Sequence, residues 1–226
     1  MKQFIILIFA CLLSQTAWAG WVVTYRNAET GDRSQAFYQG GDMSLQEAIY
    51  MDGHFIVIDR GSRSYWQGTP QQYCAAMDIM KKQMNAQMAA IPAQFRPKPM
   101  SQRNISRKKL GTKSIAGYTA TGYVFFADGV SGGDVWISSD SGLSGIIDSE
   151  RSMAKKMKCS ANMDSSGMEQ TALYKHTVEG SFILKDSNRQ VVSVEKKNIE
   201  SSRFHVPAGY KSFSDFKQFI QSFSSH

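Results

Sequence analysis

Short segments of alternating polar and apolar residues, separated by glycine-containing turns, constrain the fold of this chain more than any other feature. Such alternation is typical of half-buried strands joined by hairpins. Asp52-Gly53 is the clearest turn signal, because glycine accepts the positive φ that a tight hairpin demands. The first part of the chain therefore predicts an antiparallel meander, with strands near residues 21–25, 34–39, 43–50, 54–59 and 63–66.

Strand patterns return in the second half of the chain. We expect one strand over residues 114–126, a turn at 128–133, and further strands at 134–138, 171–177, 180–185 and 190–196. Residues 93–107 are basic and contain prolines, so they are expected to form an exposed loop. Strands do not alternate with helices, which a parallel sheet would require. The sequence thus predicts a large antiparallel sheet.

Helical periodicity interrupts the strands in three places. Thr69, Pro70 and Gln72 resemble a capping box, and apolar side chains then recur every three or four residues up to Ile91. A second helix is expected over residues 141–158, and a short closing helix carries Phe216, Phe219, Ile220 and Phe223. No repeat divides the chain. We expect one α+β domain over residues 20–226, with two or three helices packed against the sheet.

The first nineteen residues have the three parts of an export signal. Lys2 precedes an apolar run over residues 4–13, and Ala17 and Ala19 provide a small-x-small cleavage site. The run is about half the length of roughly twenty residues that a membrane-spanning helix needs. Lipidation at Cys11 is the alternative, but Phe9 is a poor fit to that motif. We expect residues 1–19 to be a cleaved signal peptide and the mature protein to reside in the periplasm, with the extracellular space as an alternative.

Two cysteines, Cys74 and Cys159, remain after cleavage. In an oxidising compartment an even number of cysteines indicates a disulfide. Free thiols or soft-metal ligation remain alternatives. A zinc site, however, favours closely spaced ligands, whereas these cysteines lie 85 residues apart and the histidines are scattered. No metal is expected.

Basic residues exceed acidic ones, by 25 to 19 once Lys2 is removed. They cluster at residues 81–82, 103–109, 155–158 and 196–197. Outside the cytoplasm such a surface meets anionic lipid head groups or acidic envelope proteins more readily than nucleic acid. We therefore expect a monomer that contacts an anionic membrane surface or an envelope protein and binds no nucleic acid. Solvated charge that only maintains solubility is the alternative.

Motifs that resemble catalytic signatures lack the context that catalysis needs. Residues 129–133 match the G-x-S-x-G nucleophile elbow, but an elbow requires a following helix, and a strand is expected there. Residues 152–155 match S-x-x-K without a K-T-G element. No phosphate loop, dinucleotide fingerprint or convincing pair of carboxylates is found. We expect neither enzymatic activity nor a cofactor.

Three apolar motifs carry a family resemblance. They are HFIVID at 54–59 leading into Tyr65-Trp66, IAGY at 115–118 followed by Tyr123 and by VWI at 135–137, and VPAGY at 206–210. Together they resemble the domain of unknown function 4412 family, which is uncharacterised. An export signal followed by a hairpin-built sheet is in turn similar to the superfamily of the periplasmic lipoprotein carrier LolA and its receptor LolB. This resemblance implies a curved half-barrel with helices packed on its concave, apolar face.

Methionine dominates the stripe of the first helix. Thioether side chains are flexible, so they suit either an irregular core or a surface that accepts varied apolar ligands, and copper(I) binding is a third reading. Our leading hypothesis is a non-catalytic binding protein that shelters a lipid, acyl chain or lipidated peptide in an apolar cleft lined by Tyr73, Met77, Met80, Met84 and Met88. The alternative is an interaction module with a filled core that docks on an envelope protein or polysaccharide, and an uncharacterised hydrolase ranks third.

Overall fold

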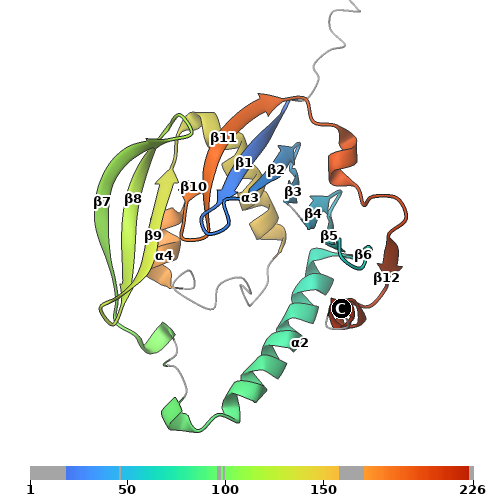
Figure 1. Ribbon diagram of the computed structural model, residues 1–226, viewed down its shortest axis with the longest axis horizontal. Helices are drawn as coiled ribbons and strands as arrows, with labels where there is room; N and C mark the ends of the chain where they lie inside the picture. Colours follow the sequence, from blue (N-terminus) through green and yellow to red (C-terminus); the bar gives the residue numbers. More distant parts are fainter. Residues whose placement is uncertain (1–18, 46, 96–97, 99, 158–170, 224–226) are drawn as a thin grey trace, which may run out of the picture.

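The computed structural model describes residues 19–45, 47–95, 98, 100–157 and 171–223 (Figure 1). Within these residues twelve strands form a single sheet. In chain order they are β1 (Gly20–Asn27), β2 (Arg33–Gln39), β3 (Asp42–Leu45), β4 (Ala48–Met51), β5 (His54–Asp59), β6 (Ser64–Gly68), β7 (Ile105–Ile115), β8 (Tyr118–Ala127), β9 (Val130–Ser138), β10 (Phe182–Lys185), β11 (Arg189–Lys197) and β12 (Lys211–Phe213).

The described residues also form four α-helices and several short 3₁₀ turns. The helices are α2 (Pro70–Ala89), α3 (Ser144–Lys156), α4 (Ala172–Val178) and α5 (Phe216–Phe223), and the turns are η1 (Ala93–Phe95), η2 (Met100–Gln102), η3 (Ser141–Leu143) and η5 (Ser201–Phe204). None of these helices is both long enough and apolar enough to cross a membrane. The α+β class is confirmed.

The sheet consists of two meanders that meet in its middle. Strands β1 to β6 are neighbours in chain order, as are β7 to β11, and the pairing of β1 with β11 joins the two sets. Helix α2 lies in the connection from β6 to β7. All the pairs are antiparallel except that of β12 with β6. The hairpin-built antiparallel sheet expected from the sequence is therefore confirmed.

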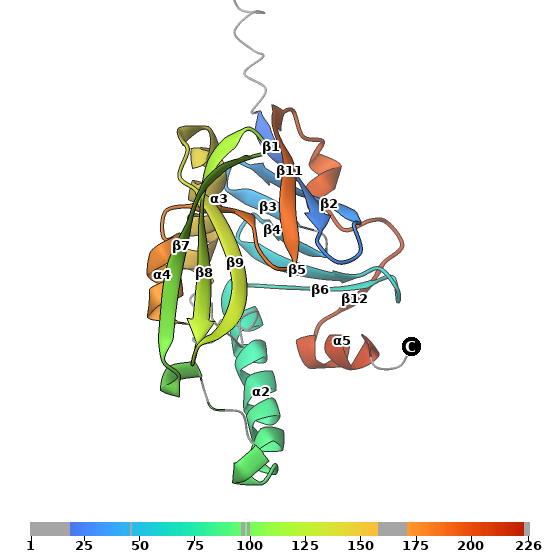
Figure 2. The same cartoon turned by 60° about the vertical axis from the view of Figure 1, so that its left-hand side comes forward.

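The sheet differs in shape from the half-barrel that the family resemblance implies. Its edge strands, β7 and β12, stand at opposite ends of the strand order, so the sheet is open, and it is not strongly curled. The helices do not fill one hollow either. Helix α3 contacts β2 and β3, α5 contacts β6 and β12, and α4 contacts β7, whereas most of α2 extends away from the sheet (Figure 2).

The start of α2 follows the sequence prediction closely. The backbone N–H of Gln72 donates to Thr69 Oγ1 over 3.2 Å, and the backbone N–H of Thr69 donates to Gln72 Oε1 over 2.7 Å. This is a reciprocal capping box, which satisfies donors that the first helical turn leaves unpaired.

The prediction of one strand over residues 114–126 is wrong. Ala116 and Gly117 have φ values of 51° and 86°, and two consecutive positive φ angles form a type I′ turn that reverses the chain. Strands β7 and β8 therefore form a hairpin around this turn. The basic residues expected in a loop up to residue 107 instead begin β7 at Ile105. Lysine-rich segments are tolerated at a sheet edge, where one side of the backbone faces solvent.

The strand expected at residues 171–177 is also wrong, because this segment forms helix α4. Thr171 caps the helix by accepting a hydrogen bond from the backbone N–H of Tyr174 over 3.2 Å. The ring of Tyr174 packs 5.0 Å from that of Phe125, and Leu173 and Val178 join the same apolar cluster. Tertiary packing thus gives this short segment its helical conformation.

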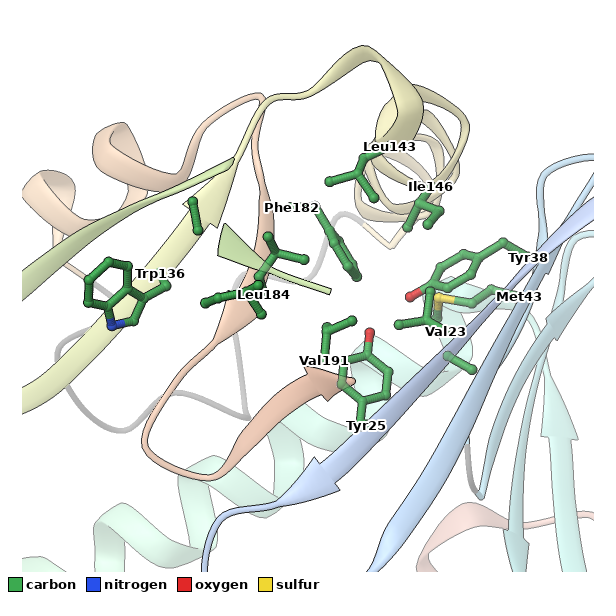
Figure 3. Close-up of a cluster of buried hydrophobic side chains, with 13 residues drawn as sticks. Val23, Tyr25, Tyr38, Met43, Trp136, Leu143, Ile146, Phe182, Leu184 and Val191 are labelled. Carbon is green, nitrogen blue, oxygen red and sulfur yellow. The ribbon is translucent and has the colours of Figure 1, made fainter. Parts of the chain in front are cut away.

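The first meander is buried on both of its faces. On one face Val23, Tyr38 and Met43 pack against Leu143 and Ile146, at the start of α3 (Figure 3). On the opposite face Val22, Ile56 and Ile58 pack against Ile199 and Phe204, from the segment around η5. The sheet is consequently the middle layer of the protein, and the segment around η5 covers only part of the second face.

Candidate ligand groove

A groove of about 1060 Å³ lies on the face of the first meander opposite α3. Successive side chains of a strand point to opposite faces of a sheet. In β2 this alternation turns Gln35 and Phe37 toward the groove, while Ala36 and Tyr38 turn toward α3. Strands β1, β3, β4, β5 and β11 also contribute side chains, and the residues around η5 form one wall.

Cationic side chains line the groove in excess over anionic ones. Arg33, Arg60 and Arg203 line it together with His205, whereas Glu47 and Glu195 are its acidic members. The hydrogen bond and the charge of Lys197, whose Nζ lies 3.0 Å from Glu195 Oε2, hold the pKa of the Glu195 carboxyl below its usual value. One of the two negative charges thus has its own cation beside it.

The floor of the groove combines polar and apolar groups. Thr24, Ser44 and Ser193 present hydroxyl groups, and the Gln35 side-chain amide donates to Thr24 Oγ1 over 3.3 Å. Phe37 provides an aromatic surface, with the Arg203 guanidinium 5.2 Å from its ring centroid. Fixed hydroxyl groups, an amide and guanidinium groups favour a polar ligand that carries negative charge.

The contacts of the groove histidine and the placement of side chains of metal-ligating types bear on the chemistry of the groove. His205 Nδ1 lies 2.7 Å from the backbone oxygen of Ser201 rather than beside a nucleophile. Across the described part of the chain, no three His, Cys, Asp or Glu side chains gather in a way that could hold a metal ion. The groove lining offers hydroxyl, amide and guanidinium groups that can form hydrogen bonds and ion pairs.

The methionine stripe lies away from the groove. Tyr73 packs against Phe55, with ring centroids 4.4 Å apart, and against Phe216 at 5.4 Å. Met77 is buried in the same cluster and Met80 is half-buried at its edge. The side chains of Met84 and Met88 lie outside the described part of the structure. The structure therefore brings three of the five expected residues together, in an apolar cluster between α2, α5 and the sheet.

Cys74 lies at the first turns of α2, close to the end of α3. It is disulfide-bonded, and its Sγ lies 2.7 Å from the backbone oxygen of Met157. Cys159 falls outside the described residues. Its pairing with Cys74 therefore stays a prediction.

A group of titratable side chains beneath α3 was not predicted. The hydroxyl groups of Tyr25 and Tyr38 point toward one another (Figure 3), and Tyr38 donates to Glu150 Oε1 over 3.0 Å. Burial raises the pKa of Tyr25 to about 12. Burial also raises the pKa of Glu150, against the opposing effects of the Tyr38 hydrogen bond and the charge of Arg189. Tyr25 of β1, Tyr38 of β2 and Glu150 of α3 therefore link the helix to the sheet, and we assign them a structural role.

None of the groove residues was singled out from the sequence. A signal was present, since Arg33, Gln35 and Phe37 alternate with buried positions in β2. Both faces of this strand carry large apolar side chains, however, and the sequence does not say which face the distant residues around η5 cover.

The comparisons with known proteins identify one family. A family model described as "Domain of unknown function (DUF4412)" matches residues 65–210. The match begins in β6 and ends just before β12, so it includes α2 and the second meander, while β1 to β5 precede it. The comparison with curated proteins found no match.

Proposed function

The chain belongs to the DUF4412 family, a domain of unknown function. From the surfaces of the structure we propose that the protein is exported, is not an enzyme and binds an anionic oligosaccharide. The observation that carries this proposal is the groove of about 1060 Å³ with Arg33, Arg60 and Arg203 in its lining. The upper range of small-molecule pockets is about 1,000 Å³, so this groove suits several linked sugar units.

The chemistry of the lining favours a saccharide over an acyl chain. Hydroxyl and amide groups on the floor match the hydroxyl groups of sugars, and an arginine forms two parallel hydrogen bonds with a carboxylate. Phe37 adds an apolar surface next to the Arg203 guanidinium, and such a pairing suits a sugar ring with an acidic group. An acyl chain would offer no hydrogen bonds to these polar groups in place of the water that it displaces, which is unfavourable.

Calorimetric titration with oligomers of galacturonic acid tests the proposal. We expect these oligomers to bind and uncharged galactose oligomers of equal length to bind at least about tenfold more weakly, because each charge-assisted pair contributes about 1.5–3 kcal/mol. The variant Arg33→Gln with Arg203→Gln should abolish this preference. The control Lys109→Gln, on β7 and outside the groove, should keep it. Equal binding of charged and uncharged oligomers, or no binding of either, would refute the assignment.

Export rests on the signal at residues 1–19, and the fold is compatible with cleavage after Ala19. Gly20 is the first residue of β1 and pairs with Lys197. A Cβ atom at position 20 would collide with Ile199 and with the backbone oxygen of Tyr38, so this small residue suits its place in the sheet. Intact-mass analysis of protein taken from the cell envelope should give a chain that begins at Gly20, without lipid. A diacylated N-terminus at Cys11 would contradict it.

A second candidate is binding of an acyl chain between α2 and the sheet, as the resemblance of the sequence pattern to the LolA and LolB superfamily would imply. The favourable observation is that Met80 is half-buried at the edge of the aromatic cluster of Tyr73, Phe55 and Phe216. Displacement of a fluorescent fatty acid provides the test. Met80→Asp should abolish probe binding and leave a cooperative unfolding transition. Failure of the unmodified protein to bind the probe would eliminate this candidate.

A further inference from the structure

The positive charge of the chain is concentrated in one continuous segment. Residues 79–127 contain nine lysines and arginines and no acidic residue, between Asp78 and Asp128. The described part of this segment comprises most of α2, then η1 and η2, and strands β7 and β8. Nearly all of β7 is exposed, including Lys108 and Lys109. No acidic side chain within this segment neutralises these positive charges.

The exposed apolar side chains coincide with this basic segment. Among the described residues, the large hydrophobic side chains that are most exposed are Ile79 (54%), Phe95 (71%), Leu110 (45%) and Val130 (70%). All four lie between residues 79 and 130. Single exposed hydrophobic residues are ordinary at a protein surface, but here Ile79, Phe95 and Leu110 lie within the basic segment and Val130 lies just after Asp128 at its end.

The two most exposed of these side chains belong to the same end of the molecule. Phe95 ends η1, beyond the far end of α2, and Val130 begins β9 at the turn that follows β8. In both views the turn after β8 lies in the lower half of the molecule, and the chain beyond the far end of α2 lies below it (Figures 1 and 2). The backbone N–H of Asp128 donates to the oxygen of Asn104, and the N–H of Asn104 donates to Asp128 Oδ1, both over 2.9 Å. These bonds fix the turn to the chain that leads from η2 into β7.

We propose that this end of the molecule, formed by Phe95, Lys98, Arg103, Lys108 and Val130 and called here the basic apex, docks on the surface of a bilayer that contains anionic phospholipid. Lysine and arginine gain about 1 kcal/mol each near such a surface. Apolar side chains that insert between head groups add to the attraction, so the combination binds better than charge alone.

The shape of the basic apex favours a lipid surface over a folded protein partner. Phe95 and Val130 project from separate elements, and α2 carries η1 away from the sheet (Figure 2). A fluid bilayer adapts to separated apolar anchors, whereas a protein partner would need a matching recess for each. The groove is lined by β1 to β5, β11 and the residues around η5 and contains none of the residues of the basic apex, so docking at the basic apex is independent of the proposed oligosaccharide binding.

Flotation with lipid vesicles tests the proposal. The protein should float with vesicles of phosphatidylcholine that contain about one third phosphatidylglycerol and should not float with phosphatidylcholine alone. Binding should fall steeply between low and physiological salt, because exposed charges are screened within about 10 Å at 0.1 M salt. Absence of flotation with the anionic vesicles at low salt would overturn the proposal.

Matched variants distinguish the basic apex from general charge attraction. Lys98→Gln with Lys108→Gln should weaken partitioning about 25-fold, or about fivefold for each cation. Lys155→Gln with Lys217→Gln removes the same charge from α3 and α5 and should have little effect. An equal loss in both pairs would assign binding to net charge and overturn the proposal.

The apolar anchors give a second, independent readout. Phe95→Ser with Val130→Ser leaves the charge unchanged and should lower partitioning at least about tenfold, since the transfer of each side chain contributes on the order of 1 kcal/mol or more. Unchanged flotation of this variant would overturn the role of the anchors. A concentration-dependent dimer that this variant abolishes, in protein that binds no vesicles, would instead assign the basic apex to a second copy of the chain.

Discussion

The two meanders are parts of one sheet, yet they are built differently. The first, β1 to β6, has strands of four to eight residues with buried side chains on both faces, and neighbouring Val22 and Val23 are both buried. The second contains the longest strands, and in β7 only Ile115 of eleven residues is buried. Apolar side chains at successive positions place a strand inside the protein, whereas a strand with lysine at successive positions is confined to an edge. The contrast is therefore sharpest between the first meander and the edge strand β7, which provides cationic surface, whereas β9 buries successive apolar side chains as the first meander does.

The largest expected difference between the two meanders concerns the loss of one apolar side chain. Ile58→Ala in β5 removes a buried side chain and should lower the free energy of unfolding by about 2–5 kcal/mol. Leu110→Ala in β7 removes one that is 45% exposed and should change it by no more than about 0.5 kcal/mol. Urea denaturation of both variants measures the contrast. Similar losses would show that the two meanders are equally important for stability.

The next largest expected change in the free energy of unfolding concerns α2, the helix that connects the two meanders. If Cys74 pairs with Cys159, as the sequence predicts, Cys159→Ser should lower the free energy of unfolding by about 2–4 kcal/mol. Thermal unfolding with and without reductant measures this loss. The unmodified protein should lose a similar amount when reduced, and the variant should not respond. Two free thiols in denatured, unreduced protein would rule the pairing out.

A smaller effect tests the contact between α3 and the first meander. Burial raises the pKa of Glu150, so the folded state holds this proton at pH values where the unfolded state has released it. Stability from this group is therefore fully present below pH 4.5, its usual pKa, and is lost as the pH rises through the raised value. Glu150→Gln keeps an acceptor for Tyr38 and should be more stable than the unmodified protein at pH 7, with the gap closing toward pH 4.

Exposed Glu29 offers the matched control for this pH dependence. Glu29→Gln should leave the unfolding midpoint unchanged across the same pH range, because its side chain is exposed in the turn between β1 and β2. A midpoint of Glu150→Gln that runs parallel to that of the unmodified protein from pH 4 to pH 7 would contradict the assignment.

Motifs formed by neighbouring residues were enough to predict much of the fold. Features that depend on contacts between distant residues could not be predicted. The hairpin at Asp52-Gly53 and the capping box at Thr69 depend on neighbouring residues, and both were predicted. The first residues of β7, 105–107, were expected in a loop because a basic edge strand has the composition of a loop. Helix α4 was taken for a strand because its conformation depends on packing against Phe125, far away in the sequence.

The groove depends on a contact that no local pattern contains. Its wall comes from the segment around η5, which lies more than 130 residues after Gln35 and Phe37 on its floor. Arg203 and His205 have no sequence neighbour that marks them as ligand-binding residues. The apolar stripe with Tyr73 and Met77 was correctly placed on one face of a helix. What that face packs against, an aromatic cluster with Phe216, depends on the other end of the chain.

The smallest expected effect compares the tight turns of the two meanders. Asp52-Gly53 and Ala116-Gly117 both have two consecutive positive φ angles, 49° and 77° in the first turn and 51° and 86° in the second. Aspartate tolerates this conformation, whereas alanine gains nothing from it and meets steric strain. Ala116→Asn should therefore raise the free energy of unfolding by about 0.5–1 kcal/mol, while Asp52→Ala should lower it by a similar amount. Chemical denaturation of the two variants measures these shifts, and a third variant, Ala116→Gly, separates strain from side-chain hydrogen bonding. If Ala116→Asn and Ala116→Gly both leave stability unchanged, the β7–β8 hairpin does not contribute to the cooperative unit of unfolding, and the contrast between the meanders becomes sharper than their burial alone implies.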